Sequence, residues 1–251
     1  MYSKNEIKQM IFRLDFADKT VDDEIVENPK LIEKILSLFK TQQPDEVENI
    51  TSLTQDQSTP TIFKASPVRK ITKCFSTIDG DNYFKYNNNM LVFTTNSYSN
   101  KLSFEEKVEP ILSTFISESP NCLVSRIGLR FINVFDSKKY SNSDFSKKYK
   151  TFLSNGISEA QQIKYSQSII HEEIICDDIR VRLNFGLYNP TMPSPLKNRD
   201  ILIDIDAVYG GAIKTLESVM TVFKKSQSTA ENVFEMIISD SMRKKLGDFN
   251  E

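Results

Sequence analysis

Apolar residues recur at every second position in several stretches of the chain, which is the spacing of a β-strand with one buried face. Residues 6–16 show this spacing clearly, and their apolar side carries Met10, Phe12, Leu14 and Phe16. The same pattern predicts further strands at 70–79, 83–97, 123–135, 167–175, 178–188 and 200–209. Gly80-Asp81-Asn82 is the expected hairpin turn between the strands at 70–79 and 83–97.

Apolar residues spaced by three and four positions predict the helices. One helix begins at Asn28-Pro29, with proline at the first helical position, and another follows the capping-box pair Ser103 and Glu106. We further expect a short helix at 144–153 and two helices that close the chain. The second closing helix should begin at a capping-box pattern, Ser228 with Glu231, and stop at Gly247.

Two stretches are predicted to be loops. Residues 42–67 are polar and interrupted by prolines, and residues 189–195 are a second proline-rich stretch. With these loops, the first half of the chain has the order β-α-β-β-α-β, which is the ferredoxin-like order. The predicted fold is therefore α+β: an antiparallel sheet has helices on one face, and the second half contributes strands followed by two C-terminal helices. We expect a single domain, 1–251, with 1–136 and 137–251 as candidate lobes.

Composition and charge narrow the functional classes. The net charge is −2 and the pI is about 5.7, so the whole protein has no general attraction to nucleic acid or anionic membrane. No window approaches the 18 consecutive apolar residues of a membrane-spanning helix, and the first residues lack the apolar segment of a secretory signal. The three cysteines have neither metal-ligand nor disulfide-framework spacing. We expect a cytoplasmic protein with no membrane partner.

Several common catalytic motifs are missing from the sequence. His171 is the only histidine, which excludes HExxH metal sites and disfavours a Ser-His-Asp triad. None of the seven glycines belongs to a P-loop or a dinucleotide-binding motif. His171 would share a strand face with Glu173 and Asp177, but a surface histidine on an acidic strand is the favoured interpretation. The FEEK string at 104–107 resembles part of a nuclease core, yet it opens a predicted helix instead of lying on a strand. No cofactor is expected.

Three of the predicted strands carry charged residues on the face opposite their apolar side. Arginines and glycines alternate with apolar residues in 123–135 and 178–188, and aspartates do so in 200–209. If these strands are neighbours, one sheet face gathers most of the charge. The candidate ligand-binding residues are Arg126, Gly128, Arg130, Asn133, Arg180, Arg182, Asp204 and Asp206.

This charged face has several interpretations. Opposed Asp and Arg residues form cross-strand ion pairs, so the charged face could be a solvated salt-bridge ladder. Each exposed pair would then stabilise the fold by about 0–1 kcal/mol. The mid-strand glycines favour a binding site, since glycine within a strand often marks close approach by a ligand or another backbone. Arginine forks around such a patch would hold phosphate or carboxylate, as in an anion or nucleic-acid site. A protein interface is a third interpretation, and a Mg²⁺ site at Asp204 and Asp206 is a fourth.

Two strings resemble a known family. RIGLRFIN at 126–133 and LIDID at 202–206 resemble a sporadically distributed family of uncharacterised prokaryotic proteins of about 250 residues. Its members carry an R-[LI]-G-L-R-[YF]-[IV]-N strand, a later [LI]-x-D-[IV]-D strand and a C-terminal helix with a buried Phe, here Phe234. The chain has no tryptophan where members often carry one, near Phe75. The patchy distribution of the family resembles that of antiviral-defence genes, and it implies no established activity.

These observations lead to two functional hypotheses. The first is a non-catalytic binding or accessory protein, as a sensor or subunit of a prokaryotic antiviral defence complex. Its charged face would engage a partner protein, a phosphate-rich ligand or nucleic acid. The second is a metal-dependent nuclease or phosphodiesterase that uses Asp204 and Asp206, aided by Arg126 and Arg130.

Overall fold

One antiparallel sheet extends through the described part of the chain. The computed structural model describes residues 4, 6–55, 63–98, 101–155, 167–189 and 200–247, with the backbone alone for 50–55, 63–68, 101–103 and 155. Within these residues, nine strands pair in the order β2-β3-β4-β5-β1-β6-β9-β8-β7. The strands are β1 (Ile7–Phe16), β2 (Thr41–Gln55), β3 (Phe63–Ser76), β4 (Asn82–Tyr86), β5 (Met90–Thr95), β6 (Val124–Phe135), β7 (Ser168–Cys176), β8 (Ile179–Leu187) and β9 (Ile201–Ile213).

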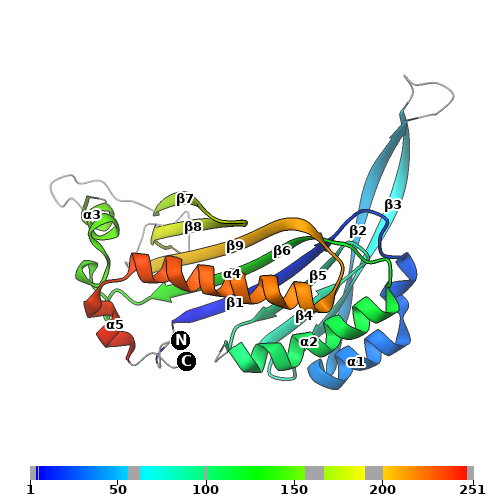
Figure 1. Cartoon of the computed structure of the whole chain (residues 1–251), viewed down its shortest axis with the longest axis horizontal. Helices are drawn as coiled ribbons and strands as arrows, with labels where there is room; N and C mark the ends of the chain where they lie inside the picture. The colour runs from blue at the N-terminus through cyan, green and yellow to red at the C-terminus, as the bar shows by residue number, and fades with distance from the viewer. Residues whose placement is uncertain are drawn as a thin grey trace.

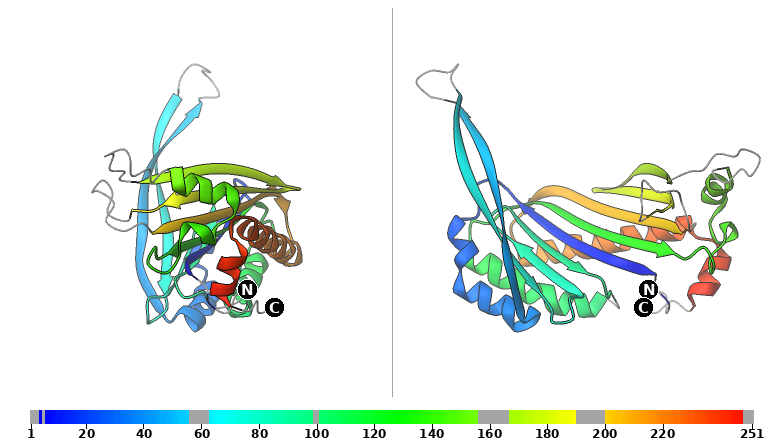
Figure 2. Two further views of the ribbon diagram at one scale, coloured as in Figure 1. Left: turned by 90° about the vertical axis from the view of Figure 1, so that its left-hand side faces the viewer. Right: turned by 180° about the vertical axis from the view of Figure 1, so that it is seen from behind.

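Helices cover one face of this sheet. The helices found in the described residues are α1 (Pro29–Phe39), α2 (Lys101–Glu118), α3 (Lys147–Asn155), α4 (Leu216–Ile237) and α5 (Asp240–Leu246), with short 3₁₀ helices η1 (Asp23–Glu27) and η2 (Asn142–Asp144). Figures 1 and 2 show α1, α2 and α4 side by side across the same face. We call the opposite face, which no described helix covers, the outer face. None of the described helices is long and apolar enough to cross a membrane.

The core lies between the sheet and these helices, and phenylalanines dominate its centre. The ring of Phe12 on β1 lies 5.7 Å from Phe104 on α2 and 5.3 Å from Phe223 on α4, measured between centroids. Phe104 and Phe223 stack on each other at 5.0 Å. Aromatic pairs at these distances stabilise a fold beyond the burial of their apolar area. The three rings therefore hold both long helices, α2 and α4, against the central strand β1.

The α+β prediction is confirmed: an antiparallel sheet carries helices on one face, and two helices close the chain. In the first half, β4-β5-β1-β6 lie side by side, with α1 following β1 and α2 connecting β5 to β6. The strand predicted at 70–79 corresponds to the second half of β3, and β2 is an additional strand between α1 and β3. The remaining strands extend the same sheet beyond β6.

The loop predicted at 42–67 is wrong for the described part of that range, because β2 and β3 form a long hairpin arm there. Residues 46–55 pair with 63–72, and no third described strand flanks them, so the arm projects from the body (Figures 1 and 2). A two-stranded ribbon that projects from the body needs no alternation of apolar and polar residues. Pro44 sits at a register irregularity between Gln43 and Glu46, a place where a strand tolerates proline.

The strand predicted at 83–97 is in fact two strands, β4 and β5, joined by a turn at residues 87–89. The Asn87 side chain accepts hydrogen bonds from the backbone N–H groups of Asn89 (2.8 Å) and Met90 (3.0 Å). An asparagine side chain that bonds its own backbone in this way makes a turn. The Gly80 turn is present as expected, and Gly80 has a φ of 73°.

Helix boundaries also differ from the prediction. α4 continues without interruption through Ser228 and Glu231 to Ile237, and α5 begins only after Ser239, whose hydroxyl accepts from the Met242 N–H. α2 begins at Lys101, so Ser103 lies inside the helix and not at its cap. Apart from Asn189, the loop predicted at 189–195 lies outside the described residues.

Candidate functional site

The structure brings seven of the eight candidate residues together on the outer face. β6 pairs with β9 and β9 with β8, so the three charged strands are neighbours. In the central row, Arg130 lies opposite Asp206, which lies opposite Arg182. The residues that share this face are Arg126, Gly128, Arg130, Arg180, Arg182, Asp204 and Asp206.

Asp204 is fully engaged by its neighbours. The Arg130 fork donates from Nε to Oδ1 and from Nη2 to Oδ2, both at 2.7 Å, and Asn184 Nδ2 donates to Oδ2 at 2.7 Å. The residue is only 3% exposed. These hydrogen bonds to Asp204 are also the main cause that raises the pKa of the Arg130 guanidinium. A bidentate pair of this kind, with a buried aspartate and a half-exposed arginine, is a structural link across β6 and β9.

Arg126 is also occupied, by an aspartate that the sequence analysis did not include. Its Nη1 lies 2.9 Å from Oδ2 of Asp15 on β1, and Asp15 also pairs with Arg13 at 2.7 Å. A Cβ atom added to Gly128 would lie 3.1 Å from Arg126 Nη2. The guanidinium of Arg126 therefore lies over Gly128, and the glycine makes room for it.

The second mid-strand glycine on this face has a backbone neighbour. A Cβ atom on Gly186 would lie 2.0 Å from the carbonyl oxygen of Ser168 on β7. Close approach of another backbone is one of the two usual reasons for glycine in a strand. The structure thus gives both glycines a packing role and not the ligand gap that the sequence suggested.

Arg180 and Arg182 are the exposed arginines of the face. Their Nε atoms lie 3.4 Å and 3.9 Å from Oε1 of Glu173 on β7, and all three side chains are more than half exposed. Pairs this open and this long contribute little to stability. Both guanidinium groups are therefore available to an incoming carboxylate.

Asp206 is the exception in the network. It is partly buried, and it makes no hydrogen bond or ion pair with any other described residue. Burial raises the pKa of its carboxyl group, while the charges of Arg126, Arg130 and Arg182 act in the opposite direction without reversing the shift. Asp206 is thus a desolvated carboxylate surrounded by arginines that are hydrogen-bonded elsewhere or exposed.

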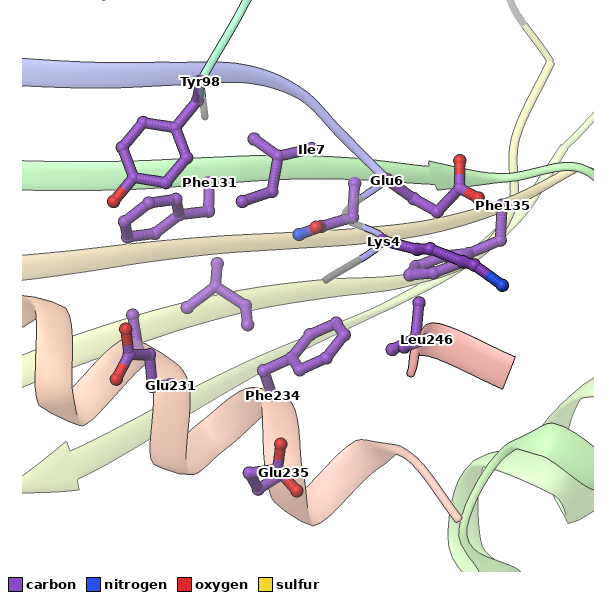
Figure 3. A pocket seen from close by; sticks show the side chains of 13 residues that line it. Lys4, Glu6, Ile7, Tyr98, Phe131, Phe135, Glu231, Phe234, Glu235 and Leu246 are labelled. Carbon is purple, nitrogen blue, oxygen red and sulfur yellow. The ribbon is translucent and has the colours of Figure 1, made fainter. Parts of the chain in front are cut away.

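Asn133 does not belong to this face, which corrects its place among the candidates. It has the same parity along β6 as Phe131 and Phe135, so it points to the helix side, where it is 4% exposed. Its Nδ2 donates to the carbonyl oxygen of Ile203 at 3.2 Å. There it lines an apolar pocket between the sheet and α4, shown in Figure 3.

His171 joins the edge of the network through Asn184. Its Nδ1 lies 2.5 Å from Asn184 Oδ1, and the side chain is exposed. Among the residues that the structure describes, no three His, Cys, Asp or Glu side chains are grouped so that they could hold a metal ion.

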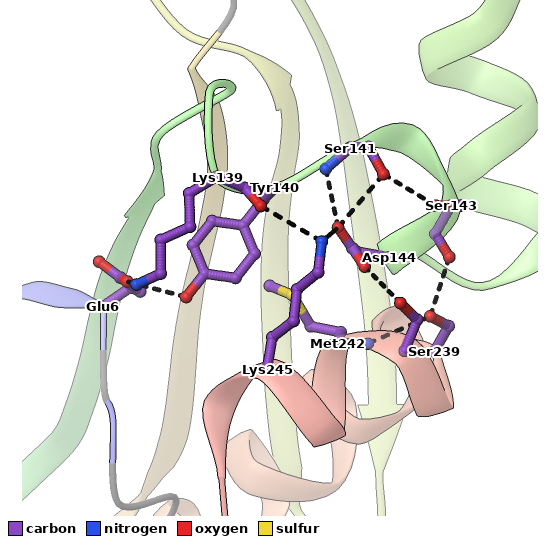
Figure 4. A network of polar contacts seen from close by, with 10 residues as sticks. Glu6, Lys139, Tyr140, Ser141, Ser143, Asp144, Ser239, Met242 and Lys245 are labelled. Atoms are coloured by element: carbon purple, nitrogen blue, oxygen red, sulfur yellow. Dashed lines mark hydrogen bonds and ion pairs between the residues drawn. The ribbon is translucent and has the colours of Figure 1, made fainter.

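A second polar network, at the end of the sheet near α5, also escaped the sequence analysis (Figure 4). Asp144 is fully buried and accepts hydrogen bonds from Lys245 Nζ (2.6 Å), Ser241 Oγ (2.7 Å) and the Ser141 N–H (2.7 Å). Burial acts to raise the pKa of Asp144, but these hydrogen bonds outweigh it and hold the pKa below its usual value. The network fastens the 136–145 segment to the C-terminal helix. Since every partner is internal, it is a structural site.

Neither comparison with known proteins adds a functional clue. No family model matches the chain, and no curated protein matches it.

Proposed function

We propose that this chain is a binding protein whose outer sheet face receives a partner protein. The observation that carries this proposal is Asp206, a desolvated carboxylate with no hydrogen-bond partner in the described structure, beside two exposed arginines. Buried polar groups normally have a partner, and the partly buried carboxylate of Asp206 can still accept a hydrogen bond from solvent or from another molecule. We propose that another molecule supplies this donor group.

The charge balance of the face favours a protein over nucleic acid. Across β1, β6, β9, β8 and β7, the outer face carries five arginines and four carboxylates, so it is nearly neutral. The arginines at the centre, Arg126 and Arg130, are already bonded to Asp15 and Asp204. Phosphate backbones bind to unpaired cations, whereas mixed charge of both signs is typical of protein interfaces with complementary potentials.

The geometry also indicates the chemistry of the contact. Asp206 and Arg182 lie directly opposite each other on β9 and β8, and Arg180 lies two residues from Arg182 on the same strand. A lysine, arginine or backbone N–H of the partner would bond to Asp206. A neighbouring carboxylate of the partner would bond to Arg180 and Arg182. With a donor at Asp206 and a carboxylate at the two arginines, the partner could bind in only one orientation.

The enzymatic hypothesis has less support. A nuclease site would need both Asp204 and Asp206 as metal ligands, but the Arg130 fork occupies both oxygens of Asp204. A role in antiviral defence, as a sensor or subunit, rests on the family resemblance of RIGLRFIN and LIDID, and it is compatible with a binding function.

Co-purification from the native cell tests the proposal. We would compare the tagged wild type with Asp206→Asn and Arg182→Glu, quantify the retained proteins, and treat half of each sample with nuclease. The matched controls are Glu217→Gln and Lys224→Glu, which make the same charge changes at exposed positions of α4 on the other side of the sheet. We expect a protein that both controls retain and that both face variants lose by about tenfold or more, whether or not nuclease is added.

Two results would count against the proposal. One is a partner that all five proteins retain equally, because the outer face would then not be its binding site. The other is a retained component that disappears on nuclease treatment, because the ligand would then be nucleic acid.

A further inference from the structure

The pocket between the sheet and α4 lies on the opposite side of the sheet from the outer face. It has about 80 Å³ of free space and is partly open to solvent. Aromatic rings form its walls: Phe131 and Phe135 come from β6 and Phe234 from α4, and Figure 3 shows the three rings facing the same space. Ile205 on β9 adds an aliphatic surface. A pocket with such walls favours an apolar group.

The charged side chains around this pocket are mostly acidic. Glu6, Glu231 and Glu235 line it, together with a single cation, Lys4. Two of the carboxylates are already paired: Glu6 accepts from Lys139 Nζ and the Tyr140 hydroxyl, and Glu235 accepts from Arg243 Nε at 2.7 Å.

Glu231 differs from the other two carboxylates. It accepts one hydrogen bond at 3.2 Å from Gln227 Nε2, one turn earlier on α4, and it has no ion pair with any described residue. It lies at the same end of the pocket as Tyr98 (Figure 3), and its charge helps burial to raise the pKa of the Tyr98 hydroxyl. The pocket therefore combines an aromatic wall with a carboxylate that has no ion pair among the described residues.

We propose that this pocket binds a small hydrophobic amine, with its ammonium group at Glu231 and its apolar part between Phe131, Phe135 and Phe234. The free volume of about 80 Å³ suits a short branched chain or part of one ring, and the rest of a larger ligand would lie at the open side of the pocket. Phe131 and Tyr98, whose rings lie 5.7 Å apart in a T-shaped pair, offer aromatic faces that favour a cation nearby. Asn133 is a further polar residue of the lining.

Calorimetric or NMR titration of the full chain tests this site with three probes of similar size. The probes are phenethylammonium, the neutral toluene and the anionic phenylpropionate. We expect phenethylammonium to bind with a Kd of about 1 mM or tighter, toluene to bind more weakly, and phenylpropionate to bind weakest. NMR shifts should fall on residues of β6 and on the second half of α4.

Two variants with one control make the test specific. Glu231→Gln should weaken phenethylammonium about tenfold and leave toluene unchanged, because a charge-assisted bond is lost while the apolar walls stay. Glu217→Gln, which removes the same charge from the exposed first turn of α4, should change neither. Ala230→Met, which fills the pocket from α4, should abolish binding of both, with circular dichroism and melting temperature verifying that each variant folds.

The proposal is overturned if phenylpropionate binds as tightly as phenethylammonium, or if Glu231→Gln binds the amine as the wild type does. Absence of any amine binding at millimolar concentration overturns it as well. None of these outcomes bears on the outer face, because co-purification of the partner is measured separately.

Discussion

Asp204 and Asp206 lie two residues apart on β9 and face the same side of the sheet, but their surroundings differ. Asp204 is nearly fully buried and bonded to Arg130 and Asn184, whereas Asp206 lies opposite Arg130 and receives nothing from it. The Arg130 side chain reaches diagonally to Asp204 and not straight across to Asp206. One aspartate of the LIDID string is therefore structural, and the other is the candidate binding residue.

Sequence reasoning could identify the residues of the outer face but not their pairing. The alternation in β6, β8 and β9 predicts which side chains share a side of the sheet, and seven of the eight candidates are found there. The candidates form their hydrogen bonds and ion pairs with residues that were not candidates: Asp15 on β1, Asn184 on β8 and Glu173 on β7. Only the register of the strands shows that these residues lie beside the candidates. Asn133 could have been excluded from this face by its parity with Phe131.

At the residue scale, we predict that Asp204→Asn destabilises the protein. The change removes the charge-assisted bonds from Arg130, which are worth about 1.5–3 kcal/mol in similar settings, so the free energy of unfolding should fall by about 2 kcal/mol. Urea denaturation measures it. Asp15→Asn, which loses the more exposed pairs with Arg13 and Arg126, is the comparison and should cost less. Equal losses would contradict a special role for the Arg130 fork.

At the scale of elements, the strands and helices that pack against each other in the core were predictable, and the hairpin arm was not. β1, β6, β8 and β9 have an apolar residue at almost every second position because one side meets the helices. The arm formed by β2 and β3 lacks that constraint, so its polar residues and prolines indicated a loop. The continuous α4 was divided at Ser228 because a capping-box pattern also occurs inside helices.

The turn between β4 and β5 gives an element-scale prediction. Asn87 is fully buried and makes three side-chain hydrogen bonds, two to the turn backbone and one to Thr72 Oγ1 at 2.8 Å. Asn87→Ala should lower the free energy of unfolding by about 2 kcal/mol, because it leaves the partly buried N–H groups of Asn89 and Met90 without their partner. Asn88→Ala, at the neighbouring and more exposed position, removes one exposed hydrogen bond to Asp23 and should cost no more than about 1 kcal/mol. Similar urea midpoints for the two variants would show that the Asn87 network does not hold the turn.

At the scale of the whole molecule, the two halves of the sequence share one sheet. β6 from the first half pairs with β9 from the second along almost its full length, and the Phe12, Phe104 and Phe223 rings join both halves in one core. An interface made of strand pairing and aromatic packing leaves neither half with a complete core. If the chain is a single domain, its two halves should therefore unfold in one cooperative transition.

We predict that β5 and β8 unfold together. Pulse-labelling hydrogen exchange along a urea titration should give the same midpoint for peptides from Met90–Thr95 and from Ile179–Leu187. Val181→Ala, a cavity-forming change in the fully buried part of β8, should lower both midpoints by the same amount. Two separate midpoints, or a shift confined to β8, would divide the chain into two domains.

The proposed binding function depends on Asp206 being desolvated and without a bonding partner, and the melting temperature of Asp206→Asn as a function of pH measures this directly. The folded-state pKa is raised, so the folded wild type binds more protons than the unfolded chain between the usual aspartate pKa of 3.8 and the raised value. The wild type therefore loses stability as pH rises through that window. Asp206→Asn should melt at a higher temperature than the wild type at pH 7, and the difference should shrink as pH falls toward 3.8. A variant that instead melts lower at pH 7, as Asp204→Asn is expected to do, would show that Asp206 is a paired member of a structural ladder and would contradict the proposed binding site.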